Sequence, residues 1–226
     1  MTPKLEKLRE EVVQRVRIRL NATEYFSKKG LDSLWGACLF EATALDILGG
    51  ACSFFTKEDA EILEYANDVE DYWEKSHGQS LNHEISCVLM NEVLLSLDSR
   101  RVKFLFGHAE TIMPMAAFLG FFKDPQHIGQ NYQSELSRKW RSGHVSPFAA
   151  NIAFALKTCP IGGDLMKFVE IRHNERLMDI SHLCENQTGR KYMCPLEEFK
   201  RSLEERIGSC NFHEICKLKE TRNTEL

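Results

Sequence analysis

The stretch that decides the fold is Val102-Lys103-Phe104-Leu105-Phe106-Gly107-His108-Ala109-Glu110-Thr111. An apolar run of large side chains ends at a glycine, and a histidine and a glutamate precede a second apolar run that opens at Thr111. This order predicts a buried strand, a tight turn and a helix from Thr111 to about Phe121. Proteins of the α/β class bind ligands beyond the carboxyl ends of strands and at helix N-termini. His108 and Glu110 are therefore a candidate site, and the alternative is a solvated histidine beside an acidic helix cap.

Length and composition describe an ordinary globular protein. The chain has 226 residues, of which 43% are hydrophobic and 27% charged, which suits one large domain or two small ones. The formal net charge of −4 gives no indication of a nucleic-acid partner. An anionic ligand would need a local basic patch, because the field of the whole chain does not attract it.

Eight cysteines are many for a chain of this size. They form no Cys-x-x-Cys pair, so we predict no zinc site. An even number fits disulfides in an oxidising compartment. Cys210 and Cys216 enclose a five-residue loop, and we expect them to pair locally. The other six are left open between disulfides and buried free thiols.

The two ends of the chain point to different compartments. The sequons Asn21-Ala22-Thr23 and Asn186-Gln187-Thr188 predict glycosylation in the secretory pathway. The final Asn223-Thr224-Glu225-Leu226 resembles the end of a Lys-Asp-Glu-Leu retention signal. Met1 to Lys7 is polar and contains no apolar signal-peptide core, and no stretch is long enough to span a membrane. One explanation is that the sequence is the C-terminal part of a longer precursor.

The first hundred residues have only helical patterns, and the remainder mixes helices with strands. Helical spacing of apolar residues predicts that 1–98 is a helical region and 99–226 an α/β region. The helices are expected at 4–20, 31–55 (buried, with a break at Gly49-Gly50), 57–77, 85–97 and 195–208, and the strands at 102–106, 147–156 and 168–171.

A second polar cluster lies downstream at Ser137-Arg138-Lys139-Trp140-Arg141-Ser142-Gly143. Three cations within four residues, together with serines and a glycine, are suited to holding phosphate groups. The alternative interpretation is the charged end of a surface helix.

These stretches together resemble a known family. Phe106 to Thr111, Gly120-Phe121-Phe122-Lys123-Asp124 and Arg138 to Gly143 occur in the order and close to the spacing of the multiple inositol polyphosphate phosphatases, the phytase-like branch of the histidine acid phosphatases. Leu63-Glu64-Tyr65 and the tail extend the resemblance over essentially the whole chain. Most acid phosphatases of that superfamily carry His-Asp where this chain has His-Ala-Glu, which points to this branch.

The resemblance implies an α/β fold of the histidine phosphatase (phosphoglycerate mutase-like) type, incomplete here, with 1–98 as a helical insert and 99–226 as the C-terminal part of the core. It implies removal of phosphates from inositol polyphosphates such as phytate, with bisphosphoglycerate as a further substrate and no cofactor. His108 would contact the phosphate and stabilise the transition state, Glu110 would protonate the leaving oxygen, and Ala109, Lys139 and Arg141 would bind substrate. A full-length member would reside in the endoplasmic reticulum lumen or be secreted.

The chain departs from the family at its nucleophile. The Arg-His-Gly-x-Arg-x-Pro motif, which supplies the family's histidine nucleophile, is absent. Arg172-His173-Asn174-Glu175-Arg176 lacks its glycine and proline and follows the His-Ala-Glu turn, so we expect His173 to be a partly buried residue at a strand end. We predict that the chain alone is inactive. The alternative is a non-catalytic, phosphate-binding or scaffolding relic, and in either case an incomplete sheet would expose an unpaired edge.

Overall fold

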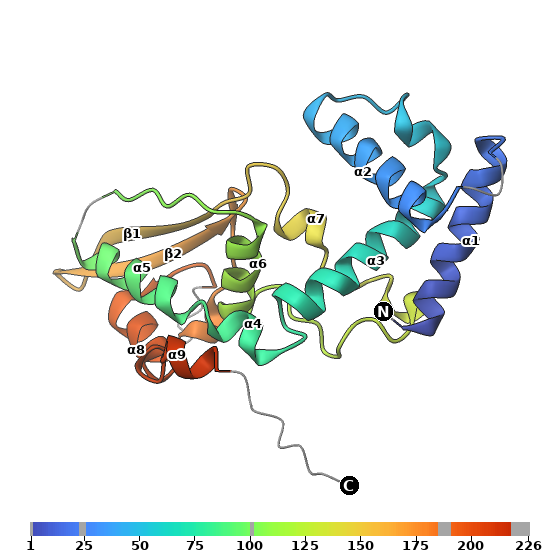
Figure 1. Ribbon diagram of the computed structural model, residues 1–226. Helices are drawn as coiled ribbons and strands as arrows, with labels where there is room; N and C mark the ends of the chain where they lie inside the picture. Colours follow the sequence, from blue (N-terminus) through green and yellow to red (C-terminus); the bar gives the residue numbers. More distant parts are fainter. Residues whose placement is uncertain (1, 23–25, 100–101, 185–190, 218–226) are drawn as a thin grey trace, which may run out of the picture. The chain divides into compact units, whose positions relative to one another are not determined.

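The computed structural model describes residues 2–22, 26–99, 102–184 and 191–217, which form two compact units (Figure 1). Unit 1 comprises Met1–Glu74 and Phe122–Ala149, and unit 2 comprises Lys75–Phe121 and Ala150–Leu226. Each unit takes residues from both sides of position 98, and the predicted division into 1–98 and 99–226 stays a prediction. In the described part of the chain, no helix has the length and apolarity that a membrane crossing requires.

Three long helices build unit 1, namely α1 (Pro3–Arg19), α2 (Lys28–Ala44) and α3 (Lys57–Lys75). The Thr2 hydroxyl caps α1 by accepting the Leu5 N–H, and a proline opens the helix, where its missing N–H costs nothing. The helix predicted at 4–20 is confirmed, and its Leu5, Val12, Val13 and Val16 are buried. It packs into a core made of Val12, Val13, Val16, Leu31, Ile62 and Leu63.

A reciprocal cap starts α3. The Thr56 hydroxyl accepts the Asp59 N–H at 3.2 Å, and the Asp59 carboxylate accepts the Thr56 N–H at 3.0 Å. Arg15 and Arg19 of α1 both donate to the same carboxylate at 2.6 Å, so one buried acid joins the two helices. Burial raises the pKa of Asp59, but the hydrogen bonds from Thr56 and the two arginines outweigh it and hold the pKa below its usual value.

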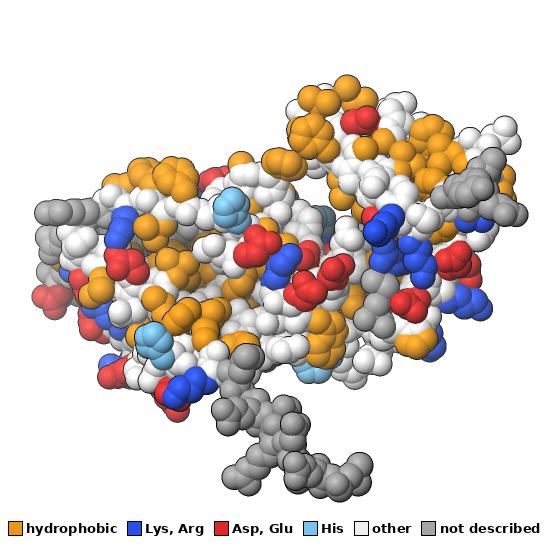
Figure 2. Space-filling model, in the orientation of Figure 1, with side chains coloured by type: hydrophobic (Ala, Val, Ile, Leu, Met, Phe, Trp, Pro, Cys, Tyr) orange, Lys and Arg blue, Asp and Glu red, His pale blue; other side chains and the backbone are white. Residues whose placement is uncertain are grey.

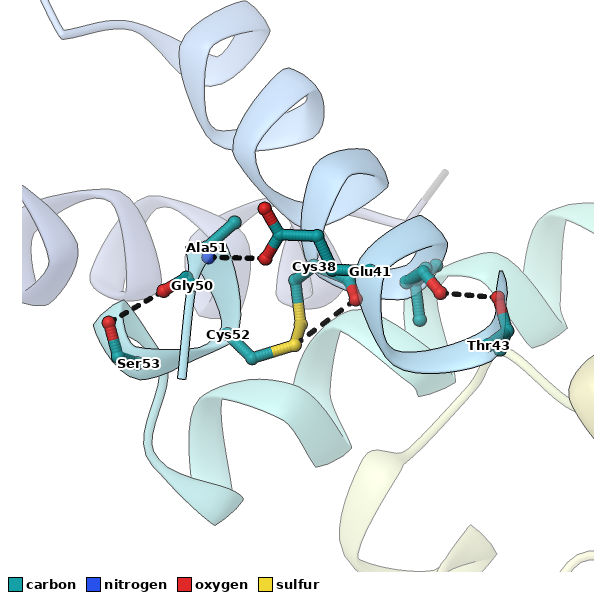
Figure 3. The surroundings of a disulfide bond; sticks show 8 residues. Cys38, Glu41, Thr43, Gly50, Ala51, Cys52 and Ser53 are labelled. Carbon is teal, nitrogen blue, oxygen red and sulfur yellow. Dashed lines mark hydrogen bonds between the residues drawn. A yellow bond between two sulfur atoms is a disulfide. The ribbon is translucent and has the colours of Figure 1, made fainter. Parts of the chain in front are cut away.

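The buried helix predicted for 31–55 is only partly present. The α2 helix ends at Ala44, and its only buried side chains are Leu31 and Cys38. A disulfide joins Cys38 to Cys52 in the 3-10 helix η1 (Ala51–Phe54), and the Glu41 carboxylate accepts the Ala51 N–H at 2.7 Å (Figure 3). The Ile47 N–H donates to the Glu41 carbonyl at 3.0 Å, so the returning loop is fixed to the helix by one disulfide and two hydrogen bonds to Glu41. Leu45, Ile47 and Leu48 are exposed, whereas Phe54 and Phe55 pack against the core of the unit.

Unit 2 combines a small antiparallel sheet with helices on either side of it in the sequence. The strand order is β1-β2-β3, and β4 pairs with β2. A tight turn at Gly162-Gly163, with φ angles of +63° and +97°, joins Ile161 to its register partner Asp164. The elements are α4 (Ser80–Glu84), α5 (Cys87–Ser99), α6 (Ala109–Phe118), β1 (Ile152–Ile161), β2 (Asp164–His173), β3 (Arg176–Leu177), η3 (Ser181–Leu183), β4 (Cys194–Pro195), α8 (Leu196–Gly208) and α9 (Phe212–Ile215).

The core of unit 2 lies between β2 and α8. Phe168, Val169 and Ile171 of β2 are buried, as are Phe199 and Leu203 of α8, and the two elements contact each other. The strand predicted at 168–171 and the helix predicted at 195–208 are therefore confirmed, and the predicted mixture of helices with a sheet is the observed class.

The strand predicted at 102–106 is wrong. The segment forms no strand. Its apolar side chains are exposed: Val102 by 85%, Phe104 by 78%, Leu105 by 53% and Phe106 by 97%. A strand needs a hydrogen-bonded neighbour, and each described strand is paired within the β1–β4 sheet. The residue types are those of a buried strand, but no described part of the chain pairs with them or covers them.

Candidate functional site

His108 and Glu110 lie at the N-terminus of α6. His108 is the N-cap residue in extended conformation, and its carbonyl oxygen accepts the N–H groups of Thr111 at 2.9 Å and Ile112 at 3.2 Å. Its side chain makes no capping hydrogen bond, and the side chains of both His108 and Glu110 are exposed. The predicted turn into a helix is confirmed, with the helix beginning at Ala109. A helix N-terminus with an exposed histidine is suited to an anionic ligand, whereas the carboxylate beside it repels one until it is protonated.

Gly107 is required by a close approach of the first helical turn. A Cβ at this position would meet the Thr111 Oγ1 at 2.8 Å and its Cβ at 3.1 Å. Any larger residue would push the turn away from α6, and His108 would move with it.

Lys75, the last residue of α3, lies beside the acid. Its Nζ is 3.5 Å from the Glu110 Oε1, and the side chain of Glu110 is 64% exposed. The backbone N–H of Glu110 and the charge of Lys75 hold the pKa of the Glu110 carboxyl below its usual value. The carboxylate is therefore ionised at neutral pH in the unliganded chain, and it must gain its proton before it can donate one.

The far end of α6 is closed by its own backbone. Gly120 adopts a φ of +77°, its N–H donates to the Ala117 carbonyl at 2.9 Å, and the Phe121 N–H donates to the Ala116 carbonyl at 2.9 Å. This pair of bonds is the Schellman arrangement that ends many helices, and it needs a residue that tolerates positive φ.

Three side chains from other elements bind the remaining carbonyl oxygens at that end. Each is a nitrogen donor, which suits the negative end of the helix dipole. They are Arg206 to Phe118 at 2.6 Å, His182 to Leu119 at 2.8 Å and His77 to Phe121 at 2.8 Å. Because the middle of α6 is buried and its end is held, the position of the His108–Glu110 turn is fixed by tertiary structure.

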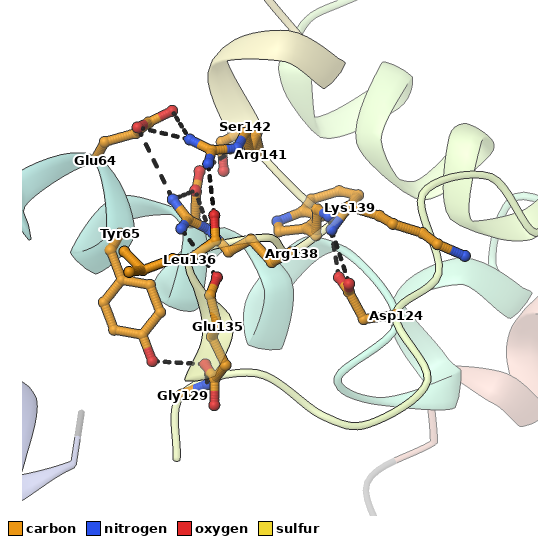
Figure 4. A network of polar contacts seen from close by, with 12 residues as sticks. Glu64, Tyr65, Asp124, Gly129, Glu135, Leu136, Arg138, Lys139, Arg141 and Ser142 are labelled. Atoms are coloured by element: carbon orange, nitrogen blue, oxygen red, sulfur yellow. Dashed lines mark hydrogen bonds and ion pairs between the residues drawn. The ribbon is translucent and has the colours of Figure 1, made fainter. Parts of the chain in front are cut away.

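The basic cluster of unit 1 is largely occupied by internal acids (Figure 4). The Arg138 guanidinium donates to the Asp68 carboxylate through Nε at 2.7 Å and through Nη2, and the two side chains are 2% and 1% exposed. The Ser142 N–H donates to the same carboxylate at 2.6 Å. Burial raises the pKa of Asp68, and Arg138 opposes that rise. Arg138 thus joins the loop to α3 and is not available to a ligand.

Arg141 and Lys139, the two cations predicted to bind substrate, have different surroundings. Arg141 Nη1 donates to both carboxylate oxygens of Glu64, at 3.0 and 3.2 Å. Lys139 is held through its backbone, where its N–H donates to Asp124 at 2.7 Å, and its exposed side chain extends away from the network (Figure 4). Its ammonium group makes no ion pair with any residue in the described ranges. Lys139 is therefore the cation of the cluster that a ligand can reach without displacing an acid.

The predicted site residues divide between the units. His108, Ala109 and Glu110 belong to unit 2, whereas Lys139 and Arg141 belong to unit 1. Their joint action on one substrate stays a prediction.

A family model described as "Histidine phosphatase superfamily (branch 2)" matches residues 1–176. The chain belongs to this superfamily. Multiple inositol polyphosphate phosphatase 1 of Gallus gallus is 32% identical over 201 residues, which cover 83% of this chain and 44% of the chicken protein. The protein of the same name from Homo sapiens is 29% identical and is covered over 40% of its length. This histidine phosphatase chain thus spans less than half the length of the curated relatives it matches.

Solved structures agree on the fold. The phytase from D. castellii superposes on 93% of this chain and 44% of its own, with a TM-score of 0.71 at 17% identity, which supports the fold alone. A Bifidobacterium longum multiple inositol polyphosphate phosphatase, solved in complex with inositol hexasulfate, gives a TM-score of 0.54 at 26% identity over 67% of this chain. The resemblance inferred from the His-Ala-Glu turn and the fold class that it implied are confirmed.

The predicted local pairing of Cys210 with Cys216 is wrong. Cys210 is bonded to Cys87 of α5, 123 residues away, and Cys216 is a free, exposed thiol. Cys210 lies just after α8, and packing of α8 against α5 brings it to Cys87, which sequence spacing does not reveal. A third disulfide joins Cys184 to Cys194.

The remaining predicted positions have mixed outcomes. Asn21 is exposed, with a φ of +48°, and its glycosylation stays a prediction. Asn186 lies outside the described residues. His173 is the last residue of β2 and is 3% exposed, which confirms its expected place at a strand end. Within the described ranges, no group of three His, Cys, Asp or Glu side chains could hold a metal ion.

Sequence reasoning missed Lys75, Arg206, His182 and His77. Lys75 is 35 positions before Glu110, and a single lysine at a helix end gives no signal of its own. The donors at the end of α6 come from three distant segments, so only the tertiary structure identifies them.

Proposed function

We propose that this chain is part of a phosphomonoesterase that removes phosphates from inositol polyphosphates such as phytate, with bisphosphoglycerate as a further substrate. The observation that carries the proposal is the exposed His108–Glu110 pair at the N-terminus of α6 in a member of the histidine phosphatase superfamily. Its relatives, which are named as multiple inositol polyphosphate phosphatases and a phytase, support the substrate class.

His108 is proposed to contact the phosphate under attack. Its side chain is exposed and takes no part in capping α6. The first N–H groups of the helix and the positive end of its dipole add to the attraction for an anion. A histidine at this place can donate hydrogen bonds to the phosphoryl oxygens as charge develops in the transition state.

Glu110 is proposed to protonate the departing inositol oxygen. Its low pKa in the unliganded chain follows from its own N–H and from Lys75. A bound phosphate group carries negative charge, which would attract Lys75 and raise the pKa of the nearby carboxyl. Substrate binding would then supply Glu110 with the proton that it donates.

Ala109, Lys139 and Arg141 are proposed to bind substrate. Lys139 is the stronger candidate for a further phosphate, because its ammonium group is exposed whereas Arg141 already faces Glu64. A phosphate group at Arg141 would have to share the guanidinium with that carboxylate.

The chain alone is proposed to be inactive, because the Arg-His-Gly-x-Arg-x-Pro motif of the family's nucleophile is absent from the sequence. Phosphate release from phytate by the purified chain should stay at the background rate. Substantial release that persists in His173→Ala would contradict the proposed inactivity, and release that His173→Ala abolishes would contradict the dismissal of that histidine.

Binding tests the site independently of turnover. NMR titration of the chain with inorganic phosphate should shift the His108 ring signals, and His108→Ala should weaken binding at least about fivefold, in keeping with one charge-assisted hydrogen bond. His213→Ala is the matched control, because His213 is an exposed histidine of the same unit on α9. Equal effects of the two variants would argue against a phosphate site at α6.

A non-catalytic phosphate-binding or scaffolding relic is the second candidate, favoured by the absent motif. Sequencing the transcript upstream of the Met1 codon separates the two proposals. A signal peptide followed by Arg-His-Gly-x-Arg-x-Pro would support an enzyme of the endoplasmic reticulum lumen or a secreted enzyme, and a stop codon in frame would support the relic.

A further inference from the structure

Single cations, correctly placed, decide where a polyanion binds on this chain. The formal net charge is −4, and on the face shown in Figure 2 the Asp and Glu side chains lie among the Lys and Arg side chains. Attraction by one cation is therefore offset by nearby acids unless that cation points at the anion. Within the basic cluster, Lys139 is the cation whose ammonium group is exposed and makes no ion pair with any residue in the described ranges.

The direction of the Lys139 side chain is set by the backbone that carries it. Burial alternates along this segment: Arg138, Trp140 and Ser142 are buried, whereas Lys139 is exposed. This two-residue period is that of extended chain, in which successive side chains point to opposite sides. Whatever holds the peptide groups beside the lysine therefore decides where its ammonium group points.

One carboxylate holds those peptide groups. Asp124 Oδ1 accepts the Lys139 N–H at 2.7 Å, and Asp124 Oδ2 accepts the Trp140 N–H at 3.0 Å (Figure 4). Both oxygens of one acid thus bind two consecutive N–H groups, which fixes the rotation of the chain as well as its position. Hydrogen bonds from an N–H group to a carboxylate are about twice as strong as those between neutral groups.

Asp124 is itself held in place. Pro125 follows it directly, and a residue before proline is restricted to extended backbone conformations. Just beyond the proline, the Trp73 ring of α3 stacks on the His127 ring with 5.2 Å between the centroids, and the Trp73 Nε1 donates to the Ile128 carbonyl at 3.0 Å. The carboxylate is therefore attached to α3 through a short and restricted stretch of chain.

We propose that Asp124 is the positioning residue for Lys139: its carboxylate holds two consecutive N–H groups so that the lysine presents its ammonium group to a phosphate group of the substrate. Asp124 does not touch the substrate and acts through the lysine. The inference rests on the proposed function, in which Lys139 binds a further phosphate of an inositol polyphosphate. Its physical basis is preorganisation, because a flexible side chain loses less freedom on binding when its backbone is already fixed.

Binding of myo-inositol hexakisphosphate to the full chain, measured by isothermal titration calorimetry, tests this role. Lys139→Met should weaken binding at least about fivefold, in keeping with the loss of one hydrogen bond to a charged group. Asp124→Asn should weaken binding at least about threefold, because an amide offers one acceptor oxygen to two N–H groups. The direction of the change is decisive, since removing a negative charge would by itself strengthen the binding of a polyanion.

A double variant separates positioning from a general loss of structure. In the Lys139→Met background, Asp124→Asn should change the affinity less than about 1.5-fold, because no ammonium group is left to position. Pro125→Ala is a milder second variant that keeps the carboxylate and frees the backbone of Asp124, and it should weaken binding about twofold when the lysine is present.

Glu41→Gln is the matched control. The Glu41 carboxylate also accepts a backbone N–H of unit 1, that of Ala51 at 2.7 Å, and the change removes the same charge from the same unit. It should leave the affinity unchanged. Deuterium exchange supplies a readout without ligand, in which the Lys139 and Trp140 amides of Asp124→Asn should exchange at least about tenfold faster than those of the unmodified chain.

The outcomes distinguish this inference from the proposed function. If Lys139→Met leaves the affinity unchanged, the proposed role of Lys139 fails, and the role of Asp124 fails with it. If Lys139→Met weakens binding but Asp124→Asn does not, the proposed function stands and positioning by Asp124 is overturned. Equal losses from Asp124→Asn with and without the lysine, or unchanged exchange of the two amides, would also overturn it.

Discussion

Replacing Arg138 by methionine tests whether the basic cluster supports unit 1 from within. Methionine keeps much of the length of the side chain but removes the guanidinium from the Asp68 carboxylate, whose side chain is 1% exposed and which keeps the Ser142 N–H as a donor. Breaking a buried ion pair by removing one partner costs about 3–5 kcal/mol. At an m value of about 2 kcal/mol/M, this corresponds to a fall of about 2 M in the urea midpoint.

Tryptophan fluorescence isolates the unit in question. The chain contains three tryptophans, and Trp35, Trp73 and Trp140 all belong to unit 1. Urea unfolding followed by this signal should show the loss in Arg138→Met. Lys57→Met is the matched control, because that lysine is 91% exposed and its ion pair with Glu61 should contribute less than about 1 kcal/mol.

The pH dependence separates a lost charge partner from lost packing. Burial raises the pKa of Asp68, and removal of Arg138 takes away the charge that opposes this rise. A carboxyl with a raised pKa in the folded state contributes stability at low pH that is lost as the pH increases. The loss in Arg138→Met should therefore be larger at pH 8 than at pH 5. A loss below about 1 kcal/mol, or one independent of pH, would refute the reasoning.

Four further predictions follow from single contacts. Gly120→Ala should lower the free energy of unfolding by about 1–2 kcal/mol in urea titrations, because alanine disfavours a φ of +77° and its Cβ would lie 3.0 Å from the His182 Nε2. Gly143→Ala is the control and should change little, because there is open space around that position. Replacing Cys38 and Cys52 by serine should cost about 3 kcal/mol, the value for a loop of this length, and an unchanged midpoint would contradict it. The free energy of unfolding of unit 1 should fall as the pH drops below 3.8, the usual pKa of aspartate, toward the lower pKa of Asp59. Asp59→Asn should reduce this pH dependence, which urea titrations at several pH values measure. Lys75→Met should raise the pKa of Glu110, measured by carbon NMR of its carboxyl, and an unshifted titration would remove Lys75 from the site.

Local patterns predicted the elements whose burial is settled by near neighbours. Helical spacing of apolar residues predicted α1 and α3, because it depends on residues within one or two helical turns. The His-Ala-Glu turn was found by the change from an apolar run to a helix, and it carried the resemblance that the family match confirms.

Features that depend on distant residues could not be predicted. The partner of Cys210 lies on α5, and the partner of Arg138 lies 70 residues earlier on α3, so neither spacing nor charge pattern identifies it. The run at 102–106 has the composition of a buried strand. Burial depends on which other residues cover a segment, and composition does not identify those residues. The sequence therefore indicated which residues are chemically suited to a site, and the structure decided which of them are already occupied.

The long separations within each unit also set an order of events during synthesis. Ribosomes add about 5–20 residues per second. Arg138 is made about 4–14 s after Asp68, and Cys210 about 6–25 s after Cys87, from separations of 70 and 123 residues. Cys159, Cys184 and Cys194 are all made within that second interval, and each can react with the waiting Cys87 thiol. The Cys87–Cys210 bond of unit 2 is thus closed late, and any earlier disulfide of Cys87 must first be exchanged, whereas the loop between Cys38 and Cys52 can close while most of the chain is still unmade.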